Sequence, residues 1–205
     1  MQEKPVLFIL ISEFADWEPA LLAAGLRWGY GLWSSPYPVK MVGLTGEPVR
    51  SIGGLTVIPD YSLDTAPEDF AALILVGGTS WHESEADKVL PLLHKAFNQN
   101  VLVGAICDAS IFLAKHGFLN TVPHTFIDPS VMVGQAKGAY SGENFFQDKQ
   151  SVRGGNIITA KPTGYVEFAR DVLSALDVAK QDQLNDFYQL CKTGDCSILM
   201  NTQQK

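Results

Sequence analysis

The sequence contains few cysteines and no cluster of basic residues. Its three cysteines, Cys107, Cys191 and Cys196, cannot build a paired disulfide framework, so we expect a reducing, cytoplasmic environment. Lysine and arginine total 15 against 22 acidic residues, which gives a net charge of −7. Because nucleic acids and anionic membranes are bound by gathered lysines and arginines, we expect neither as a partner.

Long hydrophobic runs and nucleotide-binding motifs are also lacking. No stretch approaches 18 apolar residues, and the first apolar run, 6–11, is too short to span a bilayer and has no cleavage signal after it. There is no Walker motif and no G-x-G-x-x-G. Cys191 and Cys196 lack a second pair of ligands, which makes a poor zinc site. We therefore expect a soluble protein that needs no metal and no cofactor.

The 205 residues, 46% of them hydrophobic, suffice for one well-packed α/β domain. We expect a single domain over 1–205, in which 177–205 form a C-terminal helical extension. Apolar periodicity predicts strands at 6–11, 38–44, 71–78, 101–106 and 156–161, a hairpin over 49–63 that turns at Gly53-Gly54, and helices at 17–28, 85–98, 111–115, 166–176 and 181–191. Asp16 is expected to cap the first helix. The Gly- and Pro-rich segment 120–155 is expected to form short strands and loops over the site.

Continuous apolar strands that alternate with helices are typical of a parallel sheet covered on both faces. In such sheets ligands bind beyond the carboxyl ends of the strands. Three polar or glycine-containing segments follow predicted strands: "SEFADWE", "VGGTSW" and "CDAS". Their shared position predicts one site at this edge of the sheet.

Cys107 ends a buried strand at the point where a helix begins. A free cysteine is often a small buried hydrophobic residue. At a strand–turn–helix elbow, flanked by the small residues Ala105 and Ala109, it is instead a candidate nucleophile. Because a helix N-terminus favours a thiolate, we expect its pKa to lie below the ordinary value.

Gly77 and Gly78 end the strand at 71–78, where a tight turn alone would explain them. The functional alternative is that the backbone N–H groups of Gly78 and Asp108 stabilise an oxyanion. Glu13 and Glu18 follow the first strand. Either they are solvated acids at a helix start, or one of them faces Cys107, and the sequence alone leaves both alternatives open.

The four histidines are first interpreted as structural. His94 and His116 fall on a helix and near a helix end, which favours surface or capping roles. His82 follows "GGTSW" and is a candidate for a pocket rim, with Gly77, Trp17 and Trp81 as further pocket candidates. His124 lies in the loop-rich segment "TVPHTF".

Four ordered segments resemble one family. They are "VLFILISEFADWEPALL", "VRSIGGLTVIPDYSLDTAPEDFAALILVGG", "AICDAS" and "NIITAKPTGYVEFARDVLSAL", which together cover roughly residues 5 to 176. The sequence resembles the PfpI-type intracellular proteases of the class I glutamine-amidotransferase-like superfamily, which also contains the parkinsonism-associated deglycase. The resemblance implies a flavodoxin-like three-layer α/β sandwich with a mostly parallel central sheet, often assembled as a homodimer or larger.

The resemblance also implies roles for individual residues. Cys107 corresponds to the reactive thiol, Glu18 to its carboxyl partner, and the N–H groups of Gly78 and Asp108 to the oxyanion donors. Protease-like members carry a histidine directly after the cysteine, whereas this chain has Asp108 there and Ala109 in place of a glycine. Deglycase-like members have a histidine further on, a place that His124 matches. Glutaminases use a His-x-Glu pair near the last strand, and "TAKPTGYVEF" lacks one, so glutamine hydrolysis is discounted.

Two hypotheses of different classes follow. In the first, the protein is a cysteine-dependent hydrolase of a small-molecule or peptide substrate: Cys107 attacks a carbonyl, with Glu18, His124 and Asp108 at the site. In the second, it is a stress-responsive redox sensor or binding protein in which Cys107 is oxidised to a sulfinic acid that a protonated Glu18 stabilises. A homodimer or larger oligomer is expected, with some of Trp17, Trp28, Trp33 and Trp81 at a pocket or interface.

Overall fold

The computed structural model describes residues 4–34 and 37–197. Its strands are β1 Val6–Leu10, β2 Val39–Gly43, β3 Val49–Arg50, β4 Thr56–Val57, β5 Tyr61–Ser62, β6 Ala72–Leu75, β7 Leu102–Ile106, β8 Ser151–Gly154 and β9 Ile157–Ala160. Its α-helices are α1 Trp17–Arg27, α2 Leu90–Asn98, α3 Asp108–Lys115, α4 Pro129–Ala136, α5 Tyr165–Ala175 and α6 Gln181–Thr193. Short 3-10 helices are η1 Gly29–Gly31, η2 Leu63–Thr65, η3 Thr79–His82, η4 Ser84–Val89 and η5 Glu143–Phe145.

Seven strands form the central sheet in the order β5-β2-β1-β6-β7-β9-β8. All neighbouring pairs are parallel except β8 with β9. The interior strands are continuously apolar because they are covered on both faces, and every residue of β1, β6 and β7 is buried. The expected mostly parallel α/β sandwich is confirmed.

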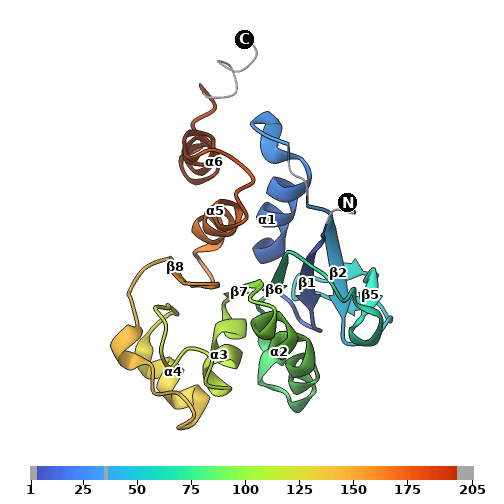
Figure 1. The fold of residues 1–205 in the computed structure, drawn as a ribbon, viewed down its shortest axis with the longest axis vertical. Helices are drawn as coiled ribbons and strands as arrows, with labels where there is room; N and C mark the ends of the chain where they lie inside the picture. Colours follow the sequence, from blue (N-terminus) through green and yellow to red (C-terminus); the bar gives the residue numbers. More distant parts are fainter. Residues whose placement is uncertain (1–3, 35–36, 198–205) are drawn as a thin grey trace.

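Helices cover the sheet in two layers (Figure 1). Helices α1, α5 and α6 lie on one face, and α2 and α3 lie on the other, with α4 beyond α3. The core is accordingly split into two clusters. Phe8, Leu22 and Phe168 belong to the cluster under α1 and α5, whereas Trp81, Leu93 and Phe112 belong to the cluster under α2 and α3. Among the described residues no helix is both long enough and apolar enough to cross a bilayer.

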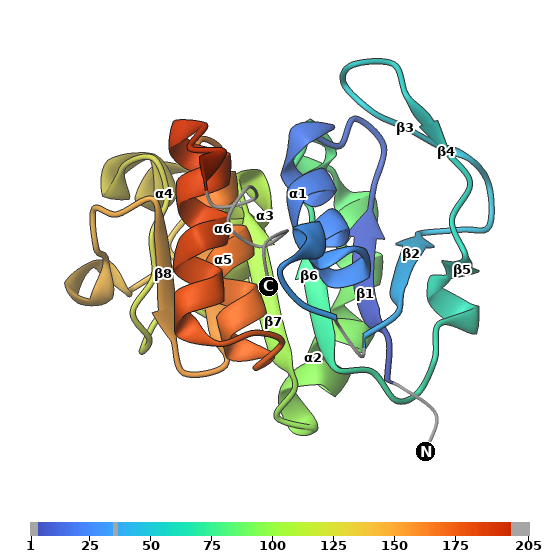
Figure 2. The ribbon, with the colours of Figure 1, turned by 90° about the horizontal axis from the view of Figure 1, so that it is seen from above.

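The hairpin β3–β4 stands outside the central sheet and projects from its edge (Figure 2). Gly54 lies in its turn with φ 89°, in agreement with the predicted Gly-Gly turn. The predicted cap of α1 was wrong. Asp16 makes no side-chain hydrogen bond to its helix and instead accepts hydrogen bonds from the Ser51 hydroxyl and, at 2.8 Å, the Gly53 N–H. It thereby fastens the hairpin to the loop between β1 and α1.

Two further expectations differ from the structure. The single helix predicted at 85–98 is a 3-10 segment, η4, followed by α2, because Pro91 lacks an N–H and favours the first turn of a helix. The segment 120–155 contains a helix, α4, in addition to short strands and loops. Its N-terminus carries a cap in which Asp128 accepts a 2.7 Å hydrogen bond from the Ser130 N–H, followed by Pro129 at the first helical position. "DPS" was the sequence signal for this helix.

Candidate active site

Cys107 occupies a tight elbow between β7 and α3. Its backbone has φ 59° and ψ −135°, a conformation that a non-glycine residue adopts only when the surrounding structure enforces it. The Cys107 N–H donates to the Ala160 carbonyl at 3.0 Å, and its own carbonyl accepts from the Ser110 N–H at 2.9 Å. Helix α3 begins directly after it, at Asp108, so the thiol lies at a helix N-terminus, with the Asp108 N–H directed at the sulfur.

Glu18 reaches the same point from the first turn of α1. Its side chain is buried, and Oε2 accepts a 2.8 Å hydrogen bond from the Gly77 N–H at the end of β6. Within the described part of the chain Oε1 has no hydrogen-bond partner. Burial raises the pKa of Glu18 to about 8, and the charge of Asp108 adds to this, although the Gly77 N–H and the Cys107 thiol oppose it. Near neutral pH this carboxyl is therefore mostly protonated.

Gly77 makes the approach of Glu18 to Cys107 possible. A Cβ atom at this position would lie 2.4 Å from Glu18 Oε2, 2.5 Å from Cys107 Cβ and 2.7 Å from the Ile106 carbonyl oxygen. Real Cβ contacts are not that short, so any side chain would separate the two groups. The glycine predicted for a turn is thus required by the packing of the carboxyl against the cysteine.

The expected low pKa of the Cys107 thiol was wrong. Burial raises its pKa above the ordinary value, and the negative charges of Glu18 and Asp108 raise it further. The Asp108 N–H acts in the opposite direction but is the weaker influence. The helix N-terminus does lower the pKa of the thiol, but loss of water and the two acidic neighbours raise it by more. A thiolate is poorly solvated in this buried position, so burial favours the protonated thiol.

Gly78 follows with φ 152°, and a Cβ there would lie 2.3 Å from the Glu13 carbonyl oxygen. The segment after β1 is hydrogen-bonded to both chain neighbours of Gly78. The Ala15 N–H donates to the Gly77 carbonyl at 2.9 Å, and the Thr79 N–H donates to the Glu13 carbonyl at 3.3 Å. No hydrogen bond from the Gly78 N–H to another described residue is found. Glu13 contributes only its backbone carbonyl to this arrangement, because its side chain is exposed.

Asp108 faces a histidine that comes from another strand end. The distance from His82 Nε2 to Asp108 Oδ2 is 3.3 Å, and the two side chains are 43% and 22% exposed. Nothing in the sequence indicated this pair, because the residues are 26 positions apart. An imidazole is thus paired with the residue that follows the cysteine, although it is not at the position where the family pattern places it.

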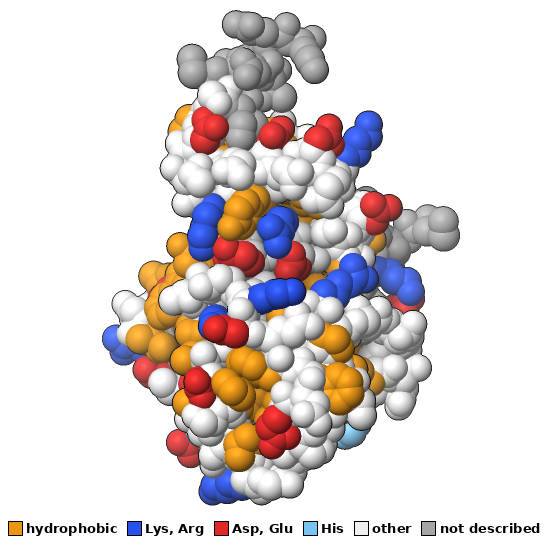
Figure 3. Space-filling view, turned by 90° about the vertical axis from the view of Figure 1, so that its left-hand side faces the viewer, with side chains coloured by type: hydrophobic (Ala, Val, Ile, Leu, Met, Phe, Trp, Pro, Cys, Tyr) orange, Lys and Arg blue, Asp and Glu red, His pale blue; other side chains and the backbone are white. Residues whose placement is uncertain are grey.

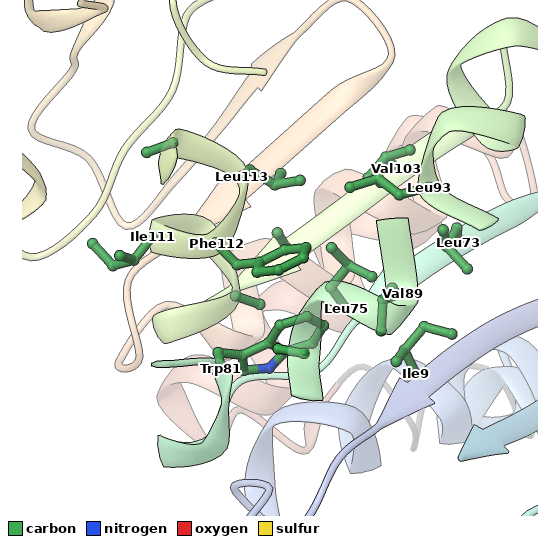
Figure 4. Close-up of a cluster of buried hydrophobic side chains, with 14 of the residues drawn as sticks. Ile9, Leu73, Leu75, Trp81, Val89, Leu93, Val103, Ile111, Phe112 and Leu113 are labelled. Carbon is green, nitrogen blue, oxygen red and sulfur yellow. The ribbon is translucent and has the colours of Figure 1, made fainter. Parts of the chain in front are cut away.

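His82 also lines a cavity of about 400 Å³ between η3, α3 and α4. Its other lining residues are Trp81, Ile111, Phe112, Lys115, Gly134, Gln135 and Lys137. Trp81 is buried with its indole N–H bonded to the Val76 carbonyl at 2.6 Å, and its ring lies 4.8 Å from that of Phe112 (Figure 4). The structure thus places the pocket candidates Trp81 and His82 at one cavity.

Trp17 lies elsewhere on the same edge of the sheet. Its side chain is 47% exposed, and its indole N–H donates to the Pro162 carbonyl at 3.3 Å, in the loop after β9. Trp28 is exposed as well, whereas Trp33 is half-buried and donates to the Gly25 carbonyl. The tryptophans considered together in the sequence therefore have different environments.

His124 is buried, and both of its ring nitrogens have partners other than the cysteine. Its Nδ1 lies 2.7 Å from the Val122 carbonyl oxygen, and its Nε2 lies 2.7 Å from the Tyr140 hydroxyl. Burial lowers the pKa of its imidazole. Neither a hydrogen bond nor an ion pair joins it to Cys107 within the described chain. Its contacts close the base of the loop that carries α4, which is a structural role.

A parallel α/β sandwich with a cysteine elbow and a facing buried glutamate defines a class of related proteins. The chain matches the DJ-1/PfpI family over residues 4–175. It is 33% identical over 196 residues to the uncharacterized protease YoaZ of Bacillus subtilis, an alignment that covers 94% of this chain and 93% of that protein. It is also 30% identical to Drosophila melanogaster protein DJ-1alpha, over 87% of this chain and 81% of that one.

Solved structures agree with this assignment. A thiJ/pfpI family protein from Bacillus anthracis superposes with a TM-score of 0.91 at 32% identity, and the match covers 100% of this chain and 97% of the other. This chain belongs to the DJ-1/PfpI family, as the sequence motifs had indicated.

Proposed function

We propose that the protein is a cysteine-dependent hydrolase of small carbonyl compounds. The observation that carries the proposal is the pairing of Cys107, held in a strained elbow, with the buried Glu18 whose pKa is about 8. An acid–base group works best when its pKa lies near the operating pH. A carboxyl tuned to this range can take the proton of a thiol that does not ionise readily by itself.

The proposed reaction starts with the thiol and the ionised carboxyl together. The sulfur forms a bond to the substrate carbonyl carbon as the thiol proton moves to Glu18, and the carbonyl π electrons move to the oxygen. The N–H groups of Asp108 and Gly78 are the proposed donors to that oxyanion. The oxyanion collapses, the leaving group departs with a proton, and water then hydrolyses the thioester and returns the thiol.

His82 is the proposed second proton carrier. Its imidazole pairs with Asp108 at 3.3 Å and lines the cavity, so it can donate to a leaving group that lies there. Asp108 orients the ring, as a carboxylate does in other nucleophile–histidine–acid arrangements. This assignment gives a role to the aspartate that replaces the expected histidine. His124, with both ring nitrogens in use, has no part in the proposal.

The test is hydrolysis of a small activated ester and of a dipeptide amide. We expect kcat/KM to fall at least about 100-fold in Cys107→Ser and in Glu18→Gln, with His94→Gln, a variant of a helix histidine away from the site, as the matched control. In the wild type the rate should rise with pH up to about 8, because Glu18 ionises there. Undiminished hydrolysis by Cys107→Ser would overturn the proposal.

One observation favours a second candidate, a redox sensor. Glu18 Oε1 is buried with no hydrogen-bond partner among the described residues, and the carboxyl is mostly protonated at neutral pH. A protonated carboxyl can donate to an oxygen added to the sulfur, which would hold Cys107 at the sulfinic acid. Mass spectrometry after hydrogen peroxide treatment tests this. A sensor accumulates the sulfinic form, which Glu18→Leu loses; equal oxidation in both proteins excludes the role.

A further inference from the structure

The cavity beside His82 differs in charge from the rest of the molecule. The chain carries 22 acidic residues and 15 lysines and arginines, yet the charged residues that line this cavity are Lys115 and Lys137, with His82 at its side. On the face shown in Figure 3 the two signs are interspersed. Charge is therefore unevenly distributed: the net charge of the protein is −7, yet this cavity is lined by two lysines and by no acidic residue.

The acidic residues nearest the cavity are already paired. Asp108 faces His82, and Asp87 accepts from His116 at 3.1 Å and lies 3.6 Å from Lys115 Nζ. Lys115 is therefore partly neutralised, whereas Lys137 has no ion pair within the described chain. At least one full positive charge thus remains available to a ligand.

Lys137 also has a backbone conformation that is more favourable for glycine than for lysine. It ends α4 with φ 52° and ψ 54°, the left-handed position at a helix C-terminus where glycine is preferred. An ordinary side chain there costs on the order of 1 kcal/mol. Gly138, the next residue, also has a positive φ, 78°, so Lys137 occupies the first of two left-handed positions. The side chain at 137 is placed at the cavity wall in spite of this cost.

The floor of the cavity is apolar and fixed. The rings of Trp81 and Phe112 pack in a tilted arrangement at a centroid distance of 4.8 Å, and the hydrogen bond from the Trp81 indole N–H to the Val76 carbonyl holds the indole in place. Ile111 completes this apolar part. A ligand that fits an aromatic floor beneath positive charges has a small hydrophobic body and an anionic group.

The cavity lies along α3, the helix that starts next to the cysteine. Ile111, Phe112 and Lys115 of this helix line it, whereas Cys107 and Asp108 do not. Asp108, Ile111 and Lys115 lie on one face of α3, since they are three and four residues apart. Lys115 comes seven positions after Asp108, roughly 10 Å along the helix axis. A molecule whose carbonyl lies at Cys107 and whose anionic group lies at Lys115 and Lys137 would span that distance.

We propose that this cavity binds a small organic anion with a hydrophobic body, and that this anion is one half of the substrate. The binding of the anion is independent of catalysis, whereas its role as part of the substrate rests on the proposed hydrolase function. The shared ligand chemistry is a carboxylate or a phosphate on an apolar group. Lysines neutralise either one as point charges.

The first experiment measures binding to the full-length chain. Phenylacetate, phenyl phosphate and the neutral phenylacetamide are titrated by NMR, with the Trp81 indole N–H as reporter of the cavity floor. We expect the anions to bind at least 10-fold more tightly than the amide, and the stronger anion identifies the head group. Lys115→Met/Lys137→Met should lose at least 10-fold in anion affinity, while Lys95→Met, on α2, should retain it. Equal binding of amide and anions, or full affinity in the double variant, would overturn the proposal.

The second experiment separates the two proposals. Hydrolysis of the nitrophenyl half-ester of azelaic acid, whose chain is long enough to span from Cys107 to the lysines, is compared with that of the neutral nitrophenyl nonanoate. The double lysine variant should raise KM at least 10-fold for the half-ester alone. If Cys107→Ser binds the anions but the wild type hydrolyses neither ester, the anion site stands and the hydrolase proposal fails. If the neutral ester is hydrolysed with no preference for the half-ester, the hydrolase stands and the anion is not part of the substrate.

Discussion

The pair of Glu18 and Cys107 shows how strongly burial controls the chemistry of a side chain. Both groups are acids, both have raised pKa values, and loss of water is the largest cause in each. At neutral pH the pair therefore holds the Glu18 proton, which a carboxyl in water would have lost, and the thiol stays protonated to a higher pH than in water. Because the groups interact closely, their titrations belong to the pair rather than to either residue.

Glu18 should make stability depend on pH. Its folded pKa of about 8 lies above the ordinary value of 4.5, so the folded state holds a proton that the unfolded state has lost. Stability should thus fall as pH rises from 4.5 to 8, by up to about 1.4 kcal/mol per pH unit. Glu18→Gln removes this slope. Urea unfolding at pH 5, 6, 7 and 8 checks it, and parallel pH profiles for the two proteins would contradict it.

Cys107 should be the slowest of the three thiols to react at neutral pH. Its pKa is raised by burial and by two carboxyls, whereas Cys196 is exposed. Asp108→Asn removes one of these charges, so it should accelerate alkylation of Cys107 several-fold at pH 7.5. Rates measured site by site with iodoacetamide and mass spectrometry test this, with Asp182→Asn on α6 as the control. A rate for Cys107 above that of Cys196 in the unmodified protein would show that the sulfur is ionised after all.

At the scale of elements, the strand ends bring the site together. Adjacent strands β1, β6 and β7 lead to Glu18, Gly77 and Cys107 respectively, so the sheet order fixes their proximity. Gly77→Ala should destabilise the protein by about 1–3 kcal/mol or more, because its Cβ would contact both groups at 2.4–2.5 Å. Gly46→Ala, at a position with no atom within 4 Å, should be nearly neutral. Denaturant midpoints compare the two, and equal midpoints would refute the packing argument.

A buried hydrogen bond between His124 and Tyr140 is one of the contacts that hold the loop carrying α4. Tyr140→Phe leaves His124 Nε2 without its partner at 2.7 Å, in a position with no exposure. We expect a loss of about 1–3 kcal/mol and faster hydrogen exchange over 124–146 than elsewhere. Tyr165→Phe, at a partly exposed tyrosine, is the control. Unchanged exchange in the loop would show that other contacts hold α4.

Sequence patterns predicted elements better than they predicted side-chain partners. The apolar runs at 6–11, 71–78 and 101–106 located three central strands, because a strand buried on both faces needs an unbroken apolar sequence. The motif around Cys107 located the elbow for a similar local reason. The pair of His82 with Asp108 and the true role of Asp16 were not predictable, since each depends on how separate loops pack at the sheet edge. The direction of the thiol pKa was missed because burial is a property of the whole fold.

At the scale of the whole molecule, apolar side chains remain exposed directly after the projecting hairpin and directly after α1. Ile58 is 75% exposed and Trp28 is 65% exposed. We expect the protein to form a homodimer at micromolar concentration and Ile58→Asp to shift it toward monomer. Light scattering gives the mass of each. Val133→Asp, an exposed apolar position on α4, is the control, and a wild-type monomer at these concentrations would contradict the expectation.

The packing of Cys107 against Glu18, which Gly77 allows, also makes the cysteine a probe of the opening of the central sheet. Because Cys107 is half-buried at the end of β7 and its thiol pKa is raised, a reagent should label it slowly in the folded state and faster once the central strands separate. Its labelling half-life in rising denaturant would therefore time the opening of the central strands, while exposed Cys196 would report the unperturbed reagent rate in the same tube. One chain thus contains both a sensor of core opening and its internal standard.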